Sequence, residues 1–110
     1  MSRGADAAER FGPDPGPAGD DPLVRDIRIV NRKGLHARAS AKFVQTVDRF
    51  RSEVTVTRCG ETVGGRSIMG LLMLGAACGT TITVAAEGED AQTCLAAIAD
   101  LVAGRFGEDE

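Results

Sequence analysis

The stretch NRKGLHARAS, residues 31–40, contains His36, the only histidine of the chain. A strand-like segment precedes this stretch and a helical pattern follows its glycine turn, so we expect His36 at a helix N-terminus. The unpaired amides and the dipole of such a helix end favour negative charge. We therefore expect a neutral imidazole, because an imidazolium would face the positive helix end, and a neutral ring nitrogen is a nucleophile near neutral pH.

Nucleophilic acceptance of a phosphoryl group is the chemistry that this arrangement predicts. The oxygens of a phosphoryl group on His36 would meet the first helical amides, and Arg38 is near enough in sequence to add charge-assisted hydrogen bonds. A helix start stabilises an exposed anion by about 0.3–1 kcal/mol, or up to about 2 kcal/mol when the anion is partly buried. Such modest stabilisation suits a group that is held briefly and then passed on.

Two other interpretations of His36 stay open from the residues alone. The histidine could merely cap the helix or lie on the surface. It could also pair with Ser40, one helical turn away, as in a hydrolase, although no third group and no glycine elbow accompany this serine. Packing or local backbone hydrogen bonding explains Ser40 more simply.

The composition limits the classes of function. A chain of 110 residues with 43% hydrophobic content is sized for one domain. With four Phe and no Tyr or Trp, the chain lacks the aromatic platforms of nucleic-acid binding. We also expect no membrane insertion and no export, because no apolar run is long enough for a membrane span and no signal sequence opens the chain.

The cysteines indicate a reducing compartment. Cys59, Cys78 and Cys94 form no CxxC pair, are odd in number and stand far from His36. We expect neither a disulfide framework nor a metal site from this spacing. The cytoplasm is therefore the predicted location.

Charge is divided unevenly along the chain. Residues 1–22 carry two Arg against five acidic residues, residues 23–66 ten basic against four acidic residues, and residues 67–110 one Arg against seven acidic residues. The basic middle part surrounds His36 and would attract acidic partners or phosphoryl groups. Ordinary surface charge is the alternative explanation.

Hydrophobic periodicity predicts the elements that position His36. Residues 1–22 hold all four prolines and are expected to form a disordered tail before one domain, residues 23–110. Alternating apolar residues predict a strand that ends near Asn31, and spacings of three and four residues predict a helix from Ala37 to about Phe50.

The second half of the chain shows the same two periodicities. Residues 53–63 are typical of a hairpin that turns at Cys59-Gly60, and a further strand is expected near residues 80–86. Ser67 is placed to cap a two-turn helix, and a last helix over residues 91–102 is indicated. The order β-α-β-β-α-β-α predicts an α+β fold, a four-stranded antiparallel sheet with three helices on one face, or open-faced sandwich.

Two motifs resemble those of a known family. GLHARAS resembles the active-site motif of HPr, the histidine-containing phosphocarrier of the bacterial phosphoenolpyruvate-dependent phosphotransferase system, and RSIMGLLMLGA resembles that family's second motif. Together with the order of elements, the resemblance covers Leu23 to about Phe106. It implies the HPr-like fold and a transiently phosphorylated carrier, not an enzyme with its own turnover, and neither a cofactor nor a metal.

The resemblance also implies roles for individual residues. His36 would receive a phosphoryl group on Nδ1 from phospho-Enzyme I and pass it to an EIIA domain. Arg38 and the backbone amides of Ala37 and Arg38 would stabilise the phosphoryl group. Ser67 would match the regulatory serine that an HPr kinase/phosphorylase modifies in many family members.

A docking surface is implied next to that serine. Ile68, Met69 and Leu72 would belong to the surface that binds partners, and a phosphate on Ser67 would add about −1.5 to −2 charges beside them. Phosphorylation would therefore obstruct docking more than folding. For Met69 and Leu72 the alternative is a place in the core.

The helical period of the apolar residues assigns them to two faces of this short helix. Half of its side chains must face the sheet, so we expect Leu71 and Leu74 in the core and Met69 and Leu72 exposed. An exposed methionine suits a surface that must fit several partners in turn.

Ala39 departs from the family pattern, which commonly has proline after the arginine. Alanine is a good helix former, so the fold should tolerate it. Ala39-Ser40 resembles the variant found in nitrogen-related paralogues (NPr) and in alphaproteobacterial HPr proteins, which are often regulatory. A regulatory interaction protein, or a small ligand-binding domain with an incidental histidine, therefore stays open beside a monomeric phosphocarrier.

Overall fold

The structure, a computed structural model, describes residues 22–109. The expected tail, residues 1–22, lies outside this range except for Pro22. The observed elements are β1 (Leu23–Arg28), α1 (Ala37–Val47), β2 (Glu53–Arg58), β3 (Glu61–Gly64), α2 (Ile68–Met73), β4 (Thr81–Glu87), α3 (Ala91–Ala103) and a 3₁₀ turn, η2 (Arg105–Gly107). The β-α-β-β-α-β-α order is confirmed.

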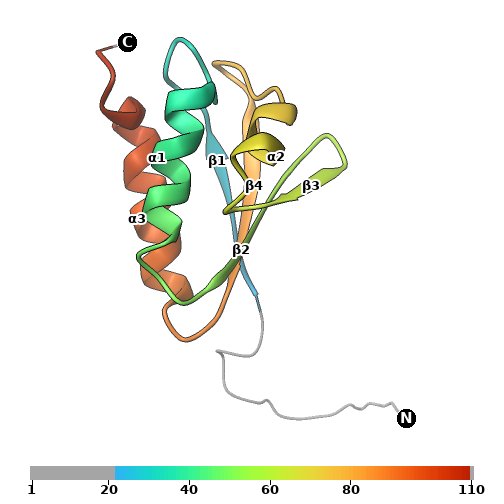
Figure 1. Ribbon diagram of the computed structural model, residues 1–110, viewed down its shortest axis with the longest axis vertical. Coiled ribbons are helices and arrows are strands. Elements are labelled where there is room, and N and C mark those ends of the chain that lie inside the picture. The colour runs from blue at the N-terminus through green and yellow to red at the C-terminus, as the bar shows by residue number, and fades with distance from the viewer. Residues whose placement is uncertain (1–21, 110) are drawn as a thin grey trace.

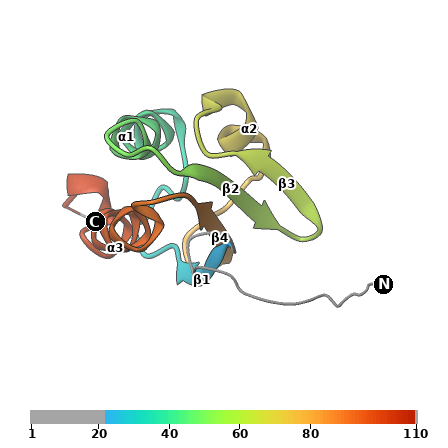
Figure 2. The ribbon, with the colours of Figure 1, turned by 90° about the horizontal axis from the view of Figure 1, so that it is seen from below.

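The four strands form one antiparallel sheet with the order β1-β4-β2-β3. All three helices lie on the same face of this sheet (Figures 1 and 2), so the predicted open-faced α+β sandwich is confirmed. Helices α1 and α3 run in opposite directions, which brings the start of α1 and the end of the chain to the same end of the molecule (Figure 1). None of the helices within residues 22–109 has the length and apolar character of a membrane span.

The β2–β3 hairpin turns where the sequence predicts. Arg58 pairs with Glu61 across the turn, and Cys59 and Gly60 both have positive φ, 52° and 82°. Positive φ at both central residues is the geometry of a type I′ turn, which matches the twist of the two strands. The sequence Cys-Gly therefore fixes the register of this edge of the sheet.

The core lies between the sheet and the helices. It is built from apolar side chains that alternate along the strands and recur at helical spacing on α1 and α3. Its largest fully buried members include Phe43, Phe106, Ile29, Leu71, Ile82 and Ile98.

Helix α1 ends at Val47, so the predicted end near Phe50 is wrong by three residues. The guanidinium of Arg66 donates to the carbonyl oxygens of Val47 (3.4 Å) and Phe50 (3.1 Å), and its Nε donates to Asp48 Oδ1 (3.0 Å). A cation on the last carbonyls satisfies the helix C-terminus and fixes where the chain turns. Phe50 continues the apolar period and packs against the core from this turn.

Helix α2 has the predicted N-cap. Ser67 Oγ accepts a hydrogen bond from the amide of Gly70 at 3.0 Å, which satisfies one of the free amides of the first turn. A Cβ on Gly70 would lie 2.9 Å from Val63 Cβ. Glycine at this position therefore allows α2 to lie close to β3.

The two faces of α2 are largely as expected. Leu71 and Leu74 are buried, and Met69 is 69% exposed, so these assignments are confirmed. Leu72 is half-buried, so its predicted exposure is only partly correct. Met73, which the period did not single out, is 73% exposed.

Candidate functional site

The loop before α1 is held against the loop that follows α2. Gly34 has a φ of +68°, and a Cβ there would lie 2.5 Å from the carbonyl oxygen of Ala76. The amide of Leu35 donates to that same oxygen at 2.8 Å. Glycine is required here both for the left-handed backbone and for the close approach. The next residue, His36, is therefore presented by a fixed loop.

His36 is the N-cap residue of α1, and its carbonyl accepts the first helical hydrogen bond, from Ser40 N at 2.8 Å. Its side chain makes no capping hydrogen bond, so the capping interpretation of the imidazole is wrong. The side chain is 26% exposed. The expectation of an accessible ring at a helix start is confirmed.

The hydrolase interpretation is not supported. Ser40 is fully buried, and its hydroxyl donates to the carbonyl of Leu35 at 3.4 Å. The His36 ring contacts the carboxylate of Glu108 and not this hydroxyl. Ser40 therefore has the packing and backbone-bonding role expected of a serine inside a helix.

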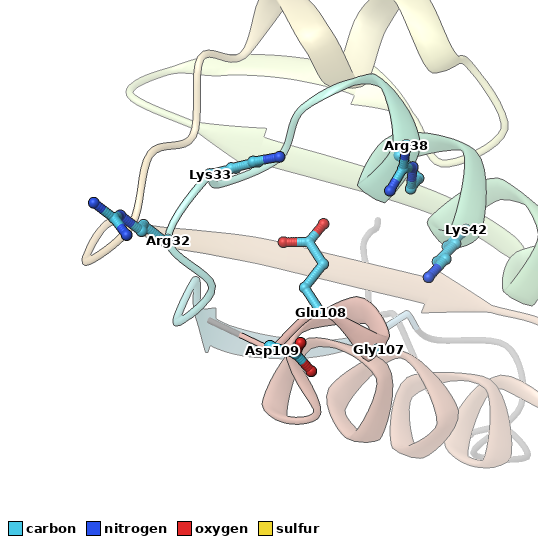
Figure 3. Close-up of a pocket in the computed structure, with 7 residues that line it drawn as sticks. All are labelled: Arg32, Lys33, Arg38, Lys42, Gly107, Glu108 and Asp109. Atoms are coloured by element: carbon cyan, nitrogen blue, oxygen red, sulfur yellow. The ribbon is translucent and has the colours of Figure 1, made fainter.

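Four basic side chains and the C-terminal segment that carries Glu108 line a hollow of about 440 Å³ beside the start of α1. Arg32 and Lys33 reach it from the loop, Arg38 and Lys42 reach it from α1, and the C-terminal segment closes the opposite side (Figure 3). Arg38, predicted as a phosphoryl-stabilising residue, thus lies in a cluster of cations drawn from two elements. Such a cluster would attract a phosphoryl group or an acidic partner.

Glu108 is a site residue that the sequence interpretation missed. Its Oε2 lies 2.5 Å from His36 Nε2, and its Oε1 accepts a hydrogen bond from Asn31 Nδ2 at 3.0 Å. Figure 3 shows its carboxylate extending from the C-terminal segment toward the basic side chains of the loop and α1. One sequence signal was available: Gly107 follows the last helix, and glycine is a strong marker of turns.

The hydrogen bond from Asn31 and then that from His36 lower the pKa of the Glu108 carboxyl below its ordinary value of 4.5. Glu108 is therefore ionised at neutral pH. Since the pKa is lowered in the folded state, these contacts contribute stability above the ordinary carboxyl range and lose it as pH falls through the folded-state value.

Of the remaining predicted site residues, Ser67 caps α2 and Ile68, Met69 and Leu72 lie on this helix, which packs beside α1 (Figures 1 and 2). Ser67, Ile68 and Met69 are exposed.

Cys59 and Cys78 are exposed free thiols and Cys94 is buried. Within residues 22–109 no group of three or more His, Cys, Asp or Glu side chains is arranged to hold a metal ion.

The fold and this site define a class of protein: a small α+β domain that presents one accessible imidazole at a helix N-terminus, flanked by cations. Residues 23–104 match the family described as PTS HPr component phosphorylation site. The phosphocarrier proteins HPr of Neisseria meningitidis serogroup A and of Cupriavidus necator are 51% and 48% identical to the chain, each over 88 residues that cover 80% of this chain and 99% of the relative.

Solved structures agree with the sequence relatives. HPr-C-His from Thermoanaerobacter tengcongensis has a TM-score of 0.77 and 39% identity, covering 80% of this chain and 99% of that one. The chain belongs to the HPr family, and it is a phosphocarrier of the phosphotransferase system that accepts a phosphoryl group from Enzyme I on a histidine and transfers it to an EIIA domain. A closer relationship of this chain to NPr and to alphaproteobacterial HPr proteins stays a prediction.

Proposed function

We propose that His36 is the residue that carries the phosphoryl group, and that the group is attached to ring Nδ1. The observation that supports this most directly is the contact of Nε2 with a carboxylate, because a nitrogen that donates its proton to Glu108 leaves the lone pair on the other ring nitrogen. The position of His36 at the N-cap supports the same role, since the adjacent helix end favours negative charge.

Arg38 and the backbone amides of Ala37 and Arg38 are the proposed stabilisers of the phosphoryl oxygens. The amides of the first helical turn have no acceptor within the helix, and Arg38 is exposed in that turn. A guanidinium and two amides supply charge-assisted hydrogen bonds without enclosing the group. Such an open arrangement allows the next protein to reach the phosphorus.

Mapping of the transferred phosphate tests this assignment. The protein would be incubated with Enzyme I and phosphoenolpyruvate, and the phosphorylated peptide identified by tandem mass spectrometry under non-acidic conditions. We expect one acid-labile phosphate on the peptide that contains His36. A phosphate found only on another residue, or no phosphate at all, would overturn the proposal.

The proposed docking surface consists of Ile68, Met69 and Leu72 on α2. Ile68 and Met69 are 40% and 69% exposed, and for Met69 this exposure is more than the core interpretation allows. Exposed apolar side chains beside a charged cluster are typical of protein-binding surfaces. The half-buried Leu72 would contribute only its outer part, and the exposed Met73 extends the same surface.

Ser67 is the proposed regulatory phosphorylation site, with an HPr kinase/phosphorylase as a further partner. Its hydroxyl is at the exposed start of α2, next to Ile68 and Met69. A phosphate there would add charge at the edge of the docking surface, while the helix N-terminus tolerates it.

The Ser67→Asp variant should receive phosphate from Enzyme I about tenfold or more slowly than wild type, because the added charge opposes docking of the apolar surface. The matched control is Ser67→Asn, since asparagine and aspartate are similar in size and both are good N-cap residues. Equal transfer rates for the two variants would exclude control by charge at this position. Rates would be measured by single-turnover phosphate transfer.

A mainly regulatory interaction protein is the second candidate function. Ala39, which stands in place of the usual proline, is buried on α1 and favours no particular acceptor protein by itself. The regulatory candidate predicts that the state of Ser67 decides partner choice, and unchanged affinities of Ser67→Asp for every partner would exclude it. We further propose a monomer in the cytoplasm, where the exposed thiols of Cys59 and Cys78 stay reduced.

A further inference from the structure

We propose that Glu108 is a positioning residue for phosphoryl transfer: its carboxylate holds the imidazole proton on His36 Nε2 and balances the positive charge that the ring acquires as the nitrogen–phosphorus bond forms at Nδ1. This inference rests on the proposed function of His36 and deepens it. It assigns a role in the transfer to the segment that follows the last long helix.

The segment that carries Glu108 follows a constrained path. Arg105, Phe106 and Gly107 all have positive φ, 58°, 55° and 79°. Left-handed backbone at two consecutive non-glycine residues persists only when the surroundings fix it. The packing of the Phe106 side chain fixes this backbone, because Phe106 is 1% exposed and belongs to the core.

A second contact comes from α1. Lys42 Nζ donates a hydrogen bond to the carbonyl oxygen of Phe106 at 2.6 Å. The buried ring and this hydrogen bond both hold the chain at Phe106, in the middle of the reversal. Glu108, two residues further on, therefore projects from an anchored segment back toward the start of α1 (Figure 3).

The two carboxylate oxygens of Glu108 have different partners. Oε2 faces His36 Nε2 and Oε1 accepts from the amide of Asn31. Asn31 is fully buried, and its Nδ2 also donates to the carbonyl of Gly34 at 2.8 Å. Because both neighbours of Nδ2 are acceptors, the orientation of this amide is fixed, and it aims the carboxylate at the imidazole.

The carboxylate has a defined effect on the ring. A neutral imidazole has one N–H donor and one lone pair, and a carboxylate can only accept. The proton is therefore kept on Nε2, and the lone pair is on Nδ1. A carboxylate that orients a catalytic imidazole and stabilises its charged form acts in the same way in serine hydrolases.

In the phosphoryl transfer, each bond that forms is matched by a bond that breaks. The Nδ1 lone pair of His36 forms the bond to phosphorus, and the bond from phosphorus to the donor atom of phospho-Enzyme I breaks, with its electron pair staying on the donor. The His36 ring keeps its Nε2 proton and becomes positively charged beside Glu108. When the phosphoryl group moves to the next acceptor, the electron pair returns to Nδ1 and the ring is neutral again.

The experiment compares Glu108→Ala and Glu108→Gln with wild type and with Asp109→Asn, which removes a charge from the next residue only. Proton and nitrogen NMR of the ring is recorded first, on unphosphorylated protein. We expect wild type and Asp109→Asn to show a hydrogen-bonded Nε2 proton at low field, and we expect Glu108→Ala to lose it. Glu108→Gln should retain a weaker hydrogen bond, because an amide oxygen can still accept.

Single-turnover transfer from phospho-Enzyme I is the second measurement. We expect a rate about 10- to 100-fold lower for Glu108→Ala, the range that follows from losing a hydrogen bond between charged groups. Glu108→Gln should lie between Glu108→Ala and wild type. Circular dichroism under the same conditions confirms that each variant is folded.

Two results would overturn the proposal: an unchanged Nε2 proton signal in Glu108→Ala, or a wild-type transfer rate in that folded variant. A wild-type protein that takes up no phosphate would instead overturn the proposed role of His36. In that case the NMR comparison alone decides whether Glu108 orients the ring.

Discussion

The His36→Asn variant should take up no phosphoryl group from Enzyme I and phosphoenolpyruvate, with labelling at the background of a reaction without Enzyme I. The chain has no second histidine, so no other imidazole can replace the lost nucleophile. Asparagine is a favourable N-cap residue, and the His36 side chain makes no capping hydrogen bond that would be lost. The fold should therefore survive while transfer does not. The measurement is phosphate incorporation followed by native mass spectrometry.

Ser40→Ala is the matched control for this experiment. Ser40 is on the same helix and buried, and its hydroxyl bonds only to a backbone carbonyl in the described contacts, so this variant should be labelled to the wild-type level. Labelling of folded His36→Asn would show that another residue carries the group. Circular dichroism of both variants separates loss of chemistry from loss of structure.

The Phe106→Ala variant should have a free energy of unfolding about 3–5 kcal/mol lower than wild type, the usual cost of truncating a buried aromatic side chain. Phe106 is 1% exposed and belongs to the core. Such a loss is a large part of the total stability of a small domain, which is about 5–15 kcal/mol. Urea denaturation followed by circular dichroism at low temperature measures it.

Phe106→Leu and Phe50→Ala are informative controls for the same measurement. Leucine keeps most of the buried volume, so its effect should be smaller, and Phe50 is only half-buried. A loss below about 1 kcal/mol for Phe106→Ala would contradict the packing of the C-terminal segment, because such values are typical of exposed positions. We also expect folded Phe106→Ala to lose the hydrogen-bonded Nε2 proton of His36, because Glu108 is no longer anchored.

Local sequence patterns predicted most of the fold. The alternation of the strands, the helical stripe from Ala91 to Val102 and the Cys59-Gly60 turn all depend on residues that are neighbours in the chain. The N-cap at Ser67 is equally local, since its partner is Gly70. The end of α1 was predicted less well because it depends on Arg66, which approaches from another part of the chain.

By itself the sequence determined the family, the carrier residue that we propose and the helix start at which that residue lies, because each follows from motifs and periods of a few residues. Only the tertiary structure decided which ring nitrogen of His36 faces a carboxylate. His36 and Glu108 are 72 residues apart in the chain, and Asn31 and Glu108 are 77 apart. Their contact depends on a left-handed reversal at Phe106 and on the burial of that ring in the core, and no local pattern of residues encodes either of them.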